Sequence, residues 1–340
     1  MTSESAAGAA RTRCIALSGG VGGAKLALGL SRILDPPSIL VVANCGDDFD
    51  HLGLRVCPDL DTLTYTLAGI ANSETGWGIA NDTGSFMNAL AALGGETWFH
   101  LGDKDLATHV ERTRRLAAGE TLSEVTAAIT RRLGIETRII PMSDDPVATV
   151  VETATGPLAF QHYFVREQCA PVVTGFRFEG AASARPQPSL VAALGEPDLE
   201  AVIICPSNPF ISIDPILAIP GFREALAEAD APVVAVSPIV AGKAIKGPTA
   251  KMMAELGIPV AAQSVARRYA GFARGFVLDH ADEGEAGAIR ALGLDVLVTE
   301  TVMRTLDDRA ALAEAVMRFA RVLTCTRISR MSSSVDAVWP

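Results

Sequence analysis

Short, nearly unbroken apolar segments recur along this chain, and they restrict its fold more than any other feature of the sequence. They lie at residues 14–17, 38–44, 97–101, 137–141, 201–206, 232–238 and 295–300. Amphipathic helical patterns separate many of them, at 105–118, 121–133, 221–229 and 307–323. A strand that is apolar at every position is buried on both faces, as in a parallel sheet covered by helices. The alternation predicts a Rossmann-like, doubly wound α/β fold, with a mostly parallel sheet and helices on both faces.

The segment from about 145 to 200 interrupts this alternation. Its residues 157–178, PLAFQHYFVREQCAPVVTGFRF, indicate antiparallel strands, so we predict a smaller inserted α/β subdomain or an extension of the sheet there. We expect a single domain over residues 13–325, a disordered tail at 1–12 and a C-terminal tail at 326–340.

Composition narrows the classes of function. The 340 residues carry a net charge of -10, which argues against a nucleic-acid-binding protein. An anionic substrate must then meet local lysines or arginines, or a metal ion. The six cysteines show no zinc-site spacing and no apolar run reaches the length of a membrane span, so we expect a reduced cytoplasmic location and no membrane contact.

Four glycines, Gly19, Gly20, Gly22 and Gly23, follow the first apolar segment, and a helical pattern begins at Lys25. A strand, a glycine-rich turn and a helix N-terminus together favour anion binding, because unpaired N–H groups and the helix dipole point at one place. We therefore predict a phosphate site. Neither standard fingerprint fits, since Lys25 stands where a third glycine belongs. The alternative is a tight turn that serves only helix–sheet packing.

Polar loops follow the predicted strands, and in this fold such loops share one crevice at the carboxyl ends of the strands. Five aspartates come after the second apolar segment: Asp47, Asp48, Asp50, Asp59 and Asp61. Carboxylates near a phosphate turn are typical ligands of Mg²⁺, and a free carboxylate can orient or deprotonate a hydroxyl nucleophile. The alternatives are turn formers and helix caps. For Asp61 we expect the helix to start at Thr62, which makes an N-cap role a serious rival.

The remaining loops offer other polar groups. Lys104 follows Gly102 and Asp103 and could contact a substrate, while Ser207 and Asn208 form a rigid turn that could face a base or ribose. Lys243 and Lys246 could neutralise phosphate or be solvated. The five histidines, His109 among them, are scattered without ligand spacing, and we expect each to be structural.

Seven stretches of the sequence, most of them containing the residues above, occur in the order in which a known family has them: SGGVGGAK, GDDFDHLGLRVCPDLDT, WGIANDT, LGDKDLATH, MSDDP, PSNPFISIDPIL and SPIVAGKAIKGP. In this, residues 14 to 325 resemble the 2-phospho-L-lactate transferase family of coenzyme F420 biosynthesis. The resemblance implies a Rossmann-like, generally dimeric, Mg²⁺-dependent enzyme. Such an enzyme moves a phosphorylated three-carbon acid from a guanosine-diphosphate-linked donor to 7,8-didemethyl-8-hydroxy-5-deazariboflavin (Fo) and releases GMP.

The resemblance also assigns roles to residues. It implies that Asp61 and Lys104 contact the deazaflavin, with Asp61 beside the ribityl hydroxyl as the catalytic residue. It makes Asp47 and Asp59 the metal-site carboxylates. The nucleotide and its phosphates would be held by Gly19, Gly20, Gly22, Gly23, Ser207, Asn208 and Lys243. Many relatives carry arginine where this chain has Lys104, which a point-charge contact tolerates.

Two other classes compete with this interpretation. The gluconeogenesis-factor family of nucleotide-sugar-binding regulators resembles the chain at the glycine turn, but typically has a DDGGSSG stretch where this chain reads GDDFDHLG. An NAD-dependent oxidoreductase is disfavoured by the missing third glycine. No residue selects among 2-phospholactate, phosphoenolpyruvate and 3-phosphoglycerate as the transferred acid.

Overall fold

The computed structural model describes residues 11–335, with side chains from 11 to 325, and its centre is a parallel sheet. The strands of this sheet lie in the order β14 (Asp295–Val298), β13 (Gly275–Leu278), β10 (Val233–Val236), β9 (Ala201–Ile204), β1 (Cys14–Ser18), β2 (Ile39–Ala43) and β5 (Arg138–Pro141). Every pair in it is parallel. The chain moves outward from β1 through β2 to β5, then returns to β9 on the other side of β1. This is the strand order of a doubly wound Rossmann-like fold, so the predicted fold class is confirmed.

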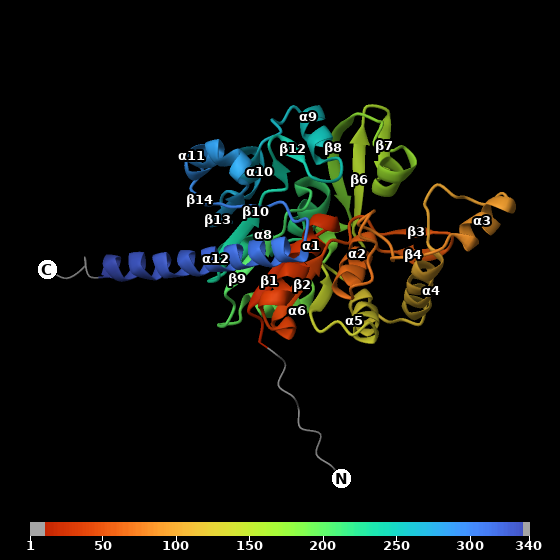
Figure 1. Ribbon diagram of the computed structural model, residues 1–340, viewed down its shortest axis with the longest axis horizontal. Helices are drawn as coiled ribbons and strands as arrows, with labels where there is room; N and C mark the ends of the chain where they lie inside the picture. The colour runs from red at the N-terminus through yellow and green to blue at the C-terminus, as the bar shows by residue number, and fades with distance from the viewer. Residues whose placement is uncertain (1–10, 336–340) are drawn as a thin grey trace, which may run out of the picture.

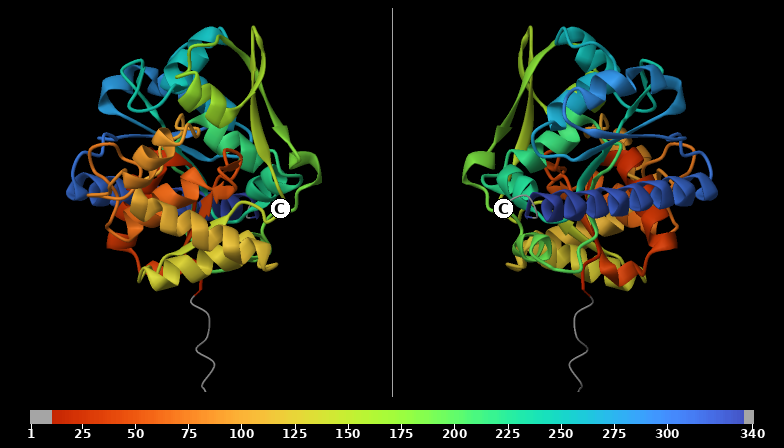
Figure 2. Two further views of the ribbon diagram at one scale, coloured as in Figure 1. Left: turned by 90° about the vertical axis from the view of Figure 1, so that its right-hand side faces the viewer. Right: turned by 90° about the vertical axis from the view of Figure 1, so that its left-hand side faces the viewer.

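Helices cover the sheet on both sides (Figures 1 and 2). They are α1 (Gly20–Ile33), α2 (Pro58–Leu67), α3 (Ser85–Ala92), α4 (Asp103–Ala117), α5 (Leu122–Arg132), α6 (Pro188–Leu194), α7 (Asp214–Leu217), α8 (Phe222–Glu228), α9 (Thr249–Glu255), α10 (Ala262–Tyr269), α11 (Ala286–Arg290) and α12 (Leu306–Val335). Short 3-10 turns lie at Pro36–Ser38, Ala181–Ser183 and His280–Glu285, and π-helical turns at His162–Arg166 and Pro209–Ile213. Helix α1 packs against α2 and α12. All residues of β1, β2, β9 and β10 are buried, as their apolar sequences require.

Smaller sheets stand at the edges of this body. Strands β6 (Ala148–Thr153), β7 (Gly156–Ala159) and β8 (Val173–Glu179) form an antiparallel sheet in the order β7-β6-β8, which confirms the antiparallel strands expected in this segment. There are also two short antiparallel hairpins. One pairs β3 (Phe49–His51) with β4 (Leu54–Val56), and the other pairs β11 (Ile239–Val240) with β12 (Lys243–Ala244). Figure 2 shows the β6–β8 sheet rising from the body beside α9.

The strand predicted at 97–101 is wrong, because residues 95–102 adopt no regular structure. The aromatic side chains there pack elsewhere: the ring of Phe49 lies 5.9 Å from that of Trp98 and 4.9 Å from that of Phe99. Leu101 joins Val56 and Met87 in a small cluster separate from the main core. Strand β13 was missed, since it has three apolar residues after a glycine and an arginine. Helix α1 begins at Gly20, five residues before the predicted start.

The predicted tails fall partly outside the described residues, which exclude 1–10 and 336–340. Thr12 is buried, and its backbone N–H donates to Glu196 at 2.5 Å. Helix α12 continues to Val335, so most of the segment predicted as a C-terminal tail is helical. Within the part of the chain that is described, no helix has the length and apolar character needed to cross a membrane.

Candidate active site

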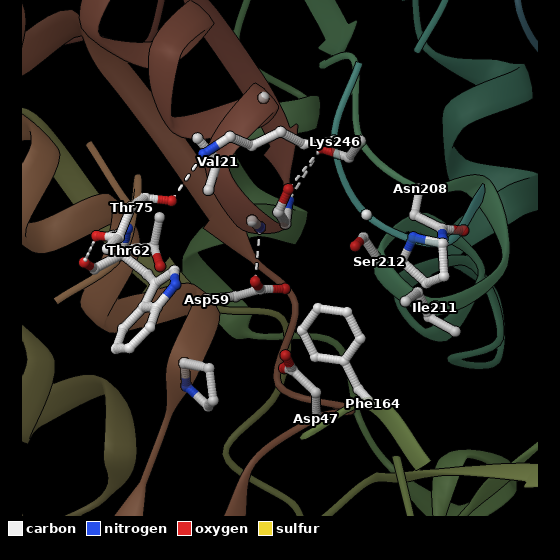
Figure 3. A pocket seen from close by; sticks show the side chains of 18 of the residues that line it. Val21, Asp47, Asp59, Thr62, Thr75, Phe164, Asn208, Ile211, Ser212 and Lys246 are labelled. Atoms are coloured by element: carbon white, nitrogen blue, oxygen red, sulfur yellow. Dashed lines mark hydrogen bonds between the residues drawn. The ribbon is translucent and has the colours of Figure 1, made fainter. Parts of the chain in front are cut away.

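A cavity of about 670 Å³ lies at the carboxyl ends of the central strands. Its lining includes Gly19 directly after β1, Ser207 in the loop after β9 and Ser237 directly after β10. The strand order reverses between β1 and β9, and ligands of doubly wound folds bind at this reversal. The predicted position of the site is therefore the position of the cavity (Figure 3).

The glycine turn is held tightly against the loop after β9. The Ser207 hydroxyl donates to the Gly19 carbonyl at 2.8 Å and accepts from the Gly19 N–H at 3.2 Å. A Cβ on Gly22 would lie 2.2 Å from the Pro206 carbonyl oxygen, and one on Gly23 would lie 2.1 Å from Ser18 Oγ. Packing alone therefore requires Gly22 and Gly23.

Alanine at Gly22 is expected to destabilise the protein by about 1–3 kcal/mol, because helix α1 must shift away from Pro206, in the loop after β9, to admit the new methyl group. Thermal unfolding measures this loss. The matched control is Gly287→Ala in helix α11, where a Cβ meets nothing within 4 Å. That variant should be as stable as the wild type or more so. Equal melting temperatures for the two variants would contradict the packing role of Gly22.

Asp47 and Asp59 face the same buried amide. Asn44, directly after β2, donates through Nδ2 to Asp47 Oδ1 at 3.2 Å and to Asp59 Oδ2 at 2.9 Å. The other oxygen of Asp59 accepts from the Gly20 N–H at 2.6 Å, at the start of α1. Both carboxylates line the cavity and point toward its centre in Figure 3. The predicted metal-site residues thus lie together beside the glycine turn.

Burial makes this pair of carboxylates hard to ionise. It raises the pKa of Asp59 to about 6, against the hydrogen bonds from Asn44 and Gly20. Burial also raises the pKa of Asp47 well above its usual range, and the negative charges of Asp59 and Asp48 add to that effect. A cation bound between Asp47 and Asp59 would remove this cost. Asp48 is buried outside the lining, and Asp50 is exposed.

Asp61 lies at the end of the first turn of helix α2, with its N–H bonded to the Cys57 carbonyl at 2.9 Å. The helix starts at Pro58 with Cys57 as its cap, so the N-cap interpretation of Asp61 is wrong. The Asp61 carboxylate lines the cavity and receives both terminal nitrogens of Arg112 from helix α4, Nη1 at 3.1 Å and Nη2 closer still. Arg112 is buried beneath the cavity, and this fork fixes the plane of the carboxylate.

His109 and Asp105 extend this polar group along helix α4. The His109 ring is buried, with Nδ1 3.7 Å from Asp61 Oδ2 and Nε2 3.3 Å from Asp105 Oδ2. The Tyr65 hydroxyl donates to Asp105 at 2.5 Å. Ligand atoms of Asp61, Asp105 and His109 lie within 4.8 Å of one another. A cation at that point would compete with the guanidinium of Arg112 for Asp61.

Two of the three lysines singled out in the sequence, Lys104 and Lys243, lie outside the cavity lining. Lys104 is exposed on α4 outside the lining, and its Nζ donates to the Asn81 carbonyl at 2.8 Å. Lys243 is exposed in β12, also outside the lining, whereas Lys246 lines the cavity. Asn208 lines it as well, although its side-chain oxygen accepts from the Phe210 N–H at 2.9 Å.

Aromatic side chains make up part of the lining. Two of the three tryptophans of the chain, Trp77 and Trp98, are there, with Phe99, Phe160 and Phe164. The rings of Phe160 and Phe164 are stacked, with centroids 5.4 Å apart. A flat heterocycle can pack on such a surface.

Comparison with known proteins identifies the family. The sequence model described as 2-phospho-L-lactate transferase CofD matches residues 14–308. The phosphoenolpyruvate transferase of Streptomyces griseus is 40% identical over 314 residues, covering 91% of this chain and 98% of that protein. The 2-phospho-L-lactate transferase of Methanosarcina mazei is 37% identical over 304 residues, covering 89% and 99%. The chain belongs to the 2-phospho-L-lactate transferase family.

Membership of the 2-phospho-L-lactate transferase family makes the chain a transferase and disfavours the oxidoreductase and regulator alternatives. A solved structure of a UPF0052 family protein from Bacillus halodurans has a TM-score of 0.58 and 13% sequence identity, and it covers 91% of this chain and 100% of that chain. At this identity the likeness bears on the fold alone.

Three residues of the candidate site, Arg112, His109 and Asn44, were not predicted as functional from the sequence. Arg112 and His109 share a helix face with Asp105, at spacings of three and four residues, and that pattern in helix 105–118 was a usable signal. Asn44 ends a buried strand, which is where ligand-facing side chains of this fold are found. Its partners, Asp47 and Asp59, were found because acids cluster in that loop.

Proposed function

We propose that this chain transfers a phosphorylated three-carbon acid from its guanosine-diphosphate-linked donor to the terminal ribityl hydroxyl of Fo, in coenzyme F420 biosynthesis. The juxtaposition of two features in one cavity carries the proposal: paired carboxylates beside the glycine turn, and an aromatic surface that suits the deazaflavin ring. The family of the chain supplies the reaction class.

In the proposed reaction the ribityl oxygen forms a bond to the phosphorus that carries the acid. The bond from that phosphorus to the guanylate oxygen breaks, GMP leaves with the electron pair, and the hydroxyl proton is released. Transfer of this kind depends on positioning and charge neutralisation more than on covalent help from the protein. This matches a cavity whose described lining has acidic side chains and no activated nucleophile.

Asp61 is placed to orient the ribityl hydroxyl. Its two oxygens hold Arg112, but a carboxylate has about four lone-pair directions, so it can still accept a hydrogen bond from the hydroxyl. The fork from Arg112 fixes the plane of the carboxylate and occupies part of its hydrogen-bonding capacity. We therefore assign Asp61 the orientation of the nucleophile first and proton acceptance second.

Asp47 and Asp59 would hold Mg²⁺, since carboxylate oxygens suit a hard cation. Burial makes both side chains hard to ionise, and a bound cation would offset that cost. The metal, when bound, would neutralise the diphosphate and favour departure of guanylate. Ser207 fixes the glycine turn, and Gly20 carries the backbone N–H nearest to Asp59. The family resemblance also implies a cytoplasmic homodimer in which Lys104 contacts Fo and Lys243 the nucleotide.

The identity of the acid follows from the product mass. The higher identity to the phosphoenolpyruvate transferase of S. griseus favours the phosphoenolpyruvate moiety. The purified protein, Fo and Mg²⁺ are incubated separately with the three guanosine-linked donors, and the products are weighed by mass spectrometry. We expect the unsaturated product, which is lighter than the phospholactyl product by two hydrogen atoms. Absence of product with every donor, together with thermal stabilisation by a UDP-sugar but not by Fo, would overturn the proposed function.

A further inference from the structure

Two lysines of the cavity lining have no carboxylate partner. Lys25 and Lys246 are the lysine or arginine residues among the described lining, which also contains Asp47, Asp59 and Asp61. Neither ammonium group lies within 4.0 Å of a carboxylate oxygen among the described residues, although the chain carries a net charge of -10. Lys251, outside the lining, is by contrast paired with Glu255 at 2.5 Å.

Both ammonium groups lie near the glycine turn. Lys25 is in the second turn of α1, and its Nζ donates to the Met303 carbonyl at 2.9 Å. Lys246 reaches across the cavity to the Thr75 carbonyl at 2.7 Å (Figure 3). A Cβ on Gly76 would lie 2.6 Å from Lys246 Nζ and 3.0 Å from Val21 Cγ1. The ammonium of Lys246 is therefore next to the first turn of α1.

Each lysine has N–H groups left to donate to a ligand. An ammonium has three N–H groups, and the structure gives each of these two lysines one strong bond, to a backbone carbonyl. Burial lowers the pKa of Lys25, and the positive charges of Arg309 and Lys246 lower it further. Positive charges thus lie close together at this side of the cavity, and no carboxylate of the described residues is ion-paired with either lysine to balance them. An anionic ligand would supply that balance.

We propose that Lys25 and Lys246 bind the diphosphate of the donor and neutralise the charge that develops on the departing guanylate. The choice of a nucleoside diphosphate rests on the proposed function. The position favours the diphosphate over the three-carbon acid, because Lys246 Nζ lies next to the first turn of α1, and the N–H of Gly20 in that turn bonds to Asp59, a metal ligand of the proposed site. Lys25 holds the inner side of this anion site and Lys246 its outer side.

Calorimetric binding of GDP in the presence of Mg²⁺ tests this assignment without turnover. Lys25→Met and Lys246→Met should each weaken GDP binding by about 10- to 100-fold, as expected when one charge-assisted hydrogen bond is removed. Guanosine, which lacks phosphates, should bind both variants as it binds the wild type. The control is Lys251→Met, which removes the same charge outside the cavity lining and should leave GDP affinity unchanged.

The outcomes separate this inference from the proposed function. Unchanged GDP affinity in both variants, or an equal loss of guanosine and GDP affinity, overturns the lysine assignment while the transferase activity stands. A wild-type protein that binds neither GDP nor its guanosine-linked donors overturns the proposed function as well. If Lys25→Met fails to fold, the exposed Lys246 still decides, because its side chain is not part of the core.

Discussion

Exchanging Asp61 for asparagine is expected to lower kcat for transfer to Fo by at least about 100-fold, the lower end of the effect of a positioned acid–base group. The amide is neutral, so it binds the ribityl hydroxyl less strongly and cannot take its proton. The Km for the guanosine-linked donor should change little, since Asp61 lies on α2 toward Arg112 and away from the glycine turn. Steady-state kinetics with Fo and donor varied in turn measure both effects.

The same substitution also costs stability, for a reason that lies beneath the cavity. Arg112 is buried and its guanidinium forks onto Asp61, so asparagine leaves an uncompensated buried charge. Breaking a buried ion pair from one side typically destabilises a protein by about 3–5 kcal/mol. A lower melting temperature is therefore expected for Asp61→Asn, and lost activity alone does not establish a role in the reaction.

A double variant separates the two effects. In Asp61→Asn with Arg112→Gln, two amides replace the ion pair, and most of the lost melting temperature should return. If Asp61 acts on the nucleophile, kcat should stay low in this restored protein. A double variant with wild-type turnover would leave Asp61 a structural partner of Arg112 only. The matched control is Glu111→Gln with Arg114→Gln, an exposed ion pair at 2.8 Å on the same helix, which should change neither quantity appreciably.

The parallel sheet could be predicted because most of its strands are buried on both faces and leave a local apolar signature, whereas the short β13 beside glycine and arginine did not. The strand at 97–101 has the same local signature and fails. Its aromatic residues find partners in Phe49 and His51, whose positions depend on the β3–β4 hairpin. An apolar run indicates that its residues are buried. Whether they are buried in the central sheet or in a separate cluster depends on the tertiary structure.

The candidate site was predictable where its residues share a loop and less so where they pair across the fold. Asp47 and Asp59 come from one acidic stretch, so their proximity follows from the order of strand and loop. Arg112 meets Asp61 from 51 positions away on another helix, which no motif spacing encodes. Lys243 and Lys246 are three residues apart, but Lys243 is paired within the β11–β12 hairpin, whereas Lys246 lies beyond it and lines the cavity.

Mg²⁺ is expected to stabilise this protein more at about pH 8 than at about pH 5. Burial raises the pKa of Asp59 from 3.8 to about 6 in the folded protein. A carboxyl with a raised pKa favours the folded state when it is protonated. In the metal-free protein the contribution of Asp59 to the free energy of unfolding is therefore largest below pH 3.8, its pKa in the unfolded chain, and is lost as the pH rises through about 6. Burial raises the pKa of Asp47 as well, so its contribution has the same sign.

A bound cation restores the stability that the metal-free protein loses at high pH. It binds the ionised carboxylates, and its positive charge offsets their negative charges. At about 100 times its Kd, Mg²⁺ would stabilise the protein by about 2.7 kcal/mol, which corresponds to a rise of about 4 °C in melting temperature for a chain of this length. At about pH 5 the rise should nearly vanish, since protons occupy the site. Thermal unfolding across the pH range, with Mg²⁺ or with EDTA, measures the difference.

Asp47→Asn tests which carboxylates respond. Removing one negative charge from the pair should raise the melting temperature of the metal-free protein, abolish the rise with Mg²⁺ and strongly reduce transfer. Asp50→Asn is the control from the same loop: its side chain is 74% exposed, and its exchange should leave the Mg²⁺ response intact. Full transfer in EDTA, or an unaltered metal requirement in Asp47→Asn, would remove the metal from this site. A variant that gains stability while losing activity is the outcome that distinguishes a metal-binding carboxylate pair from a structural one, because a structural pair has no reason to hold two buried charges in repulsion.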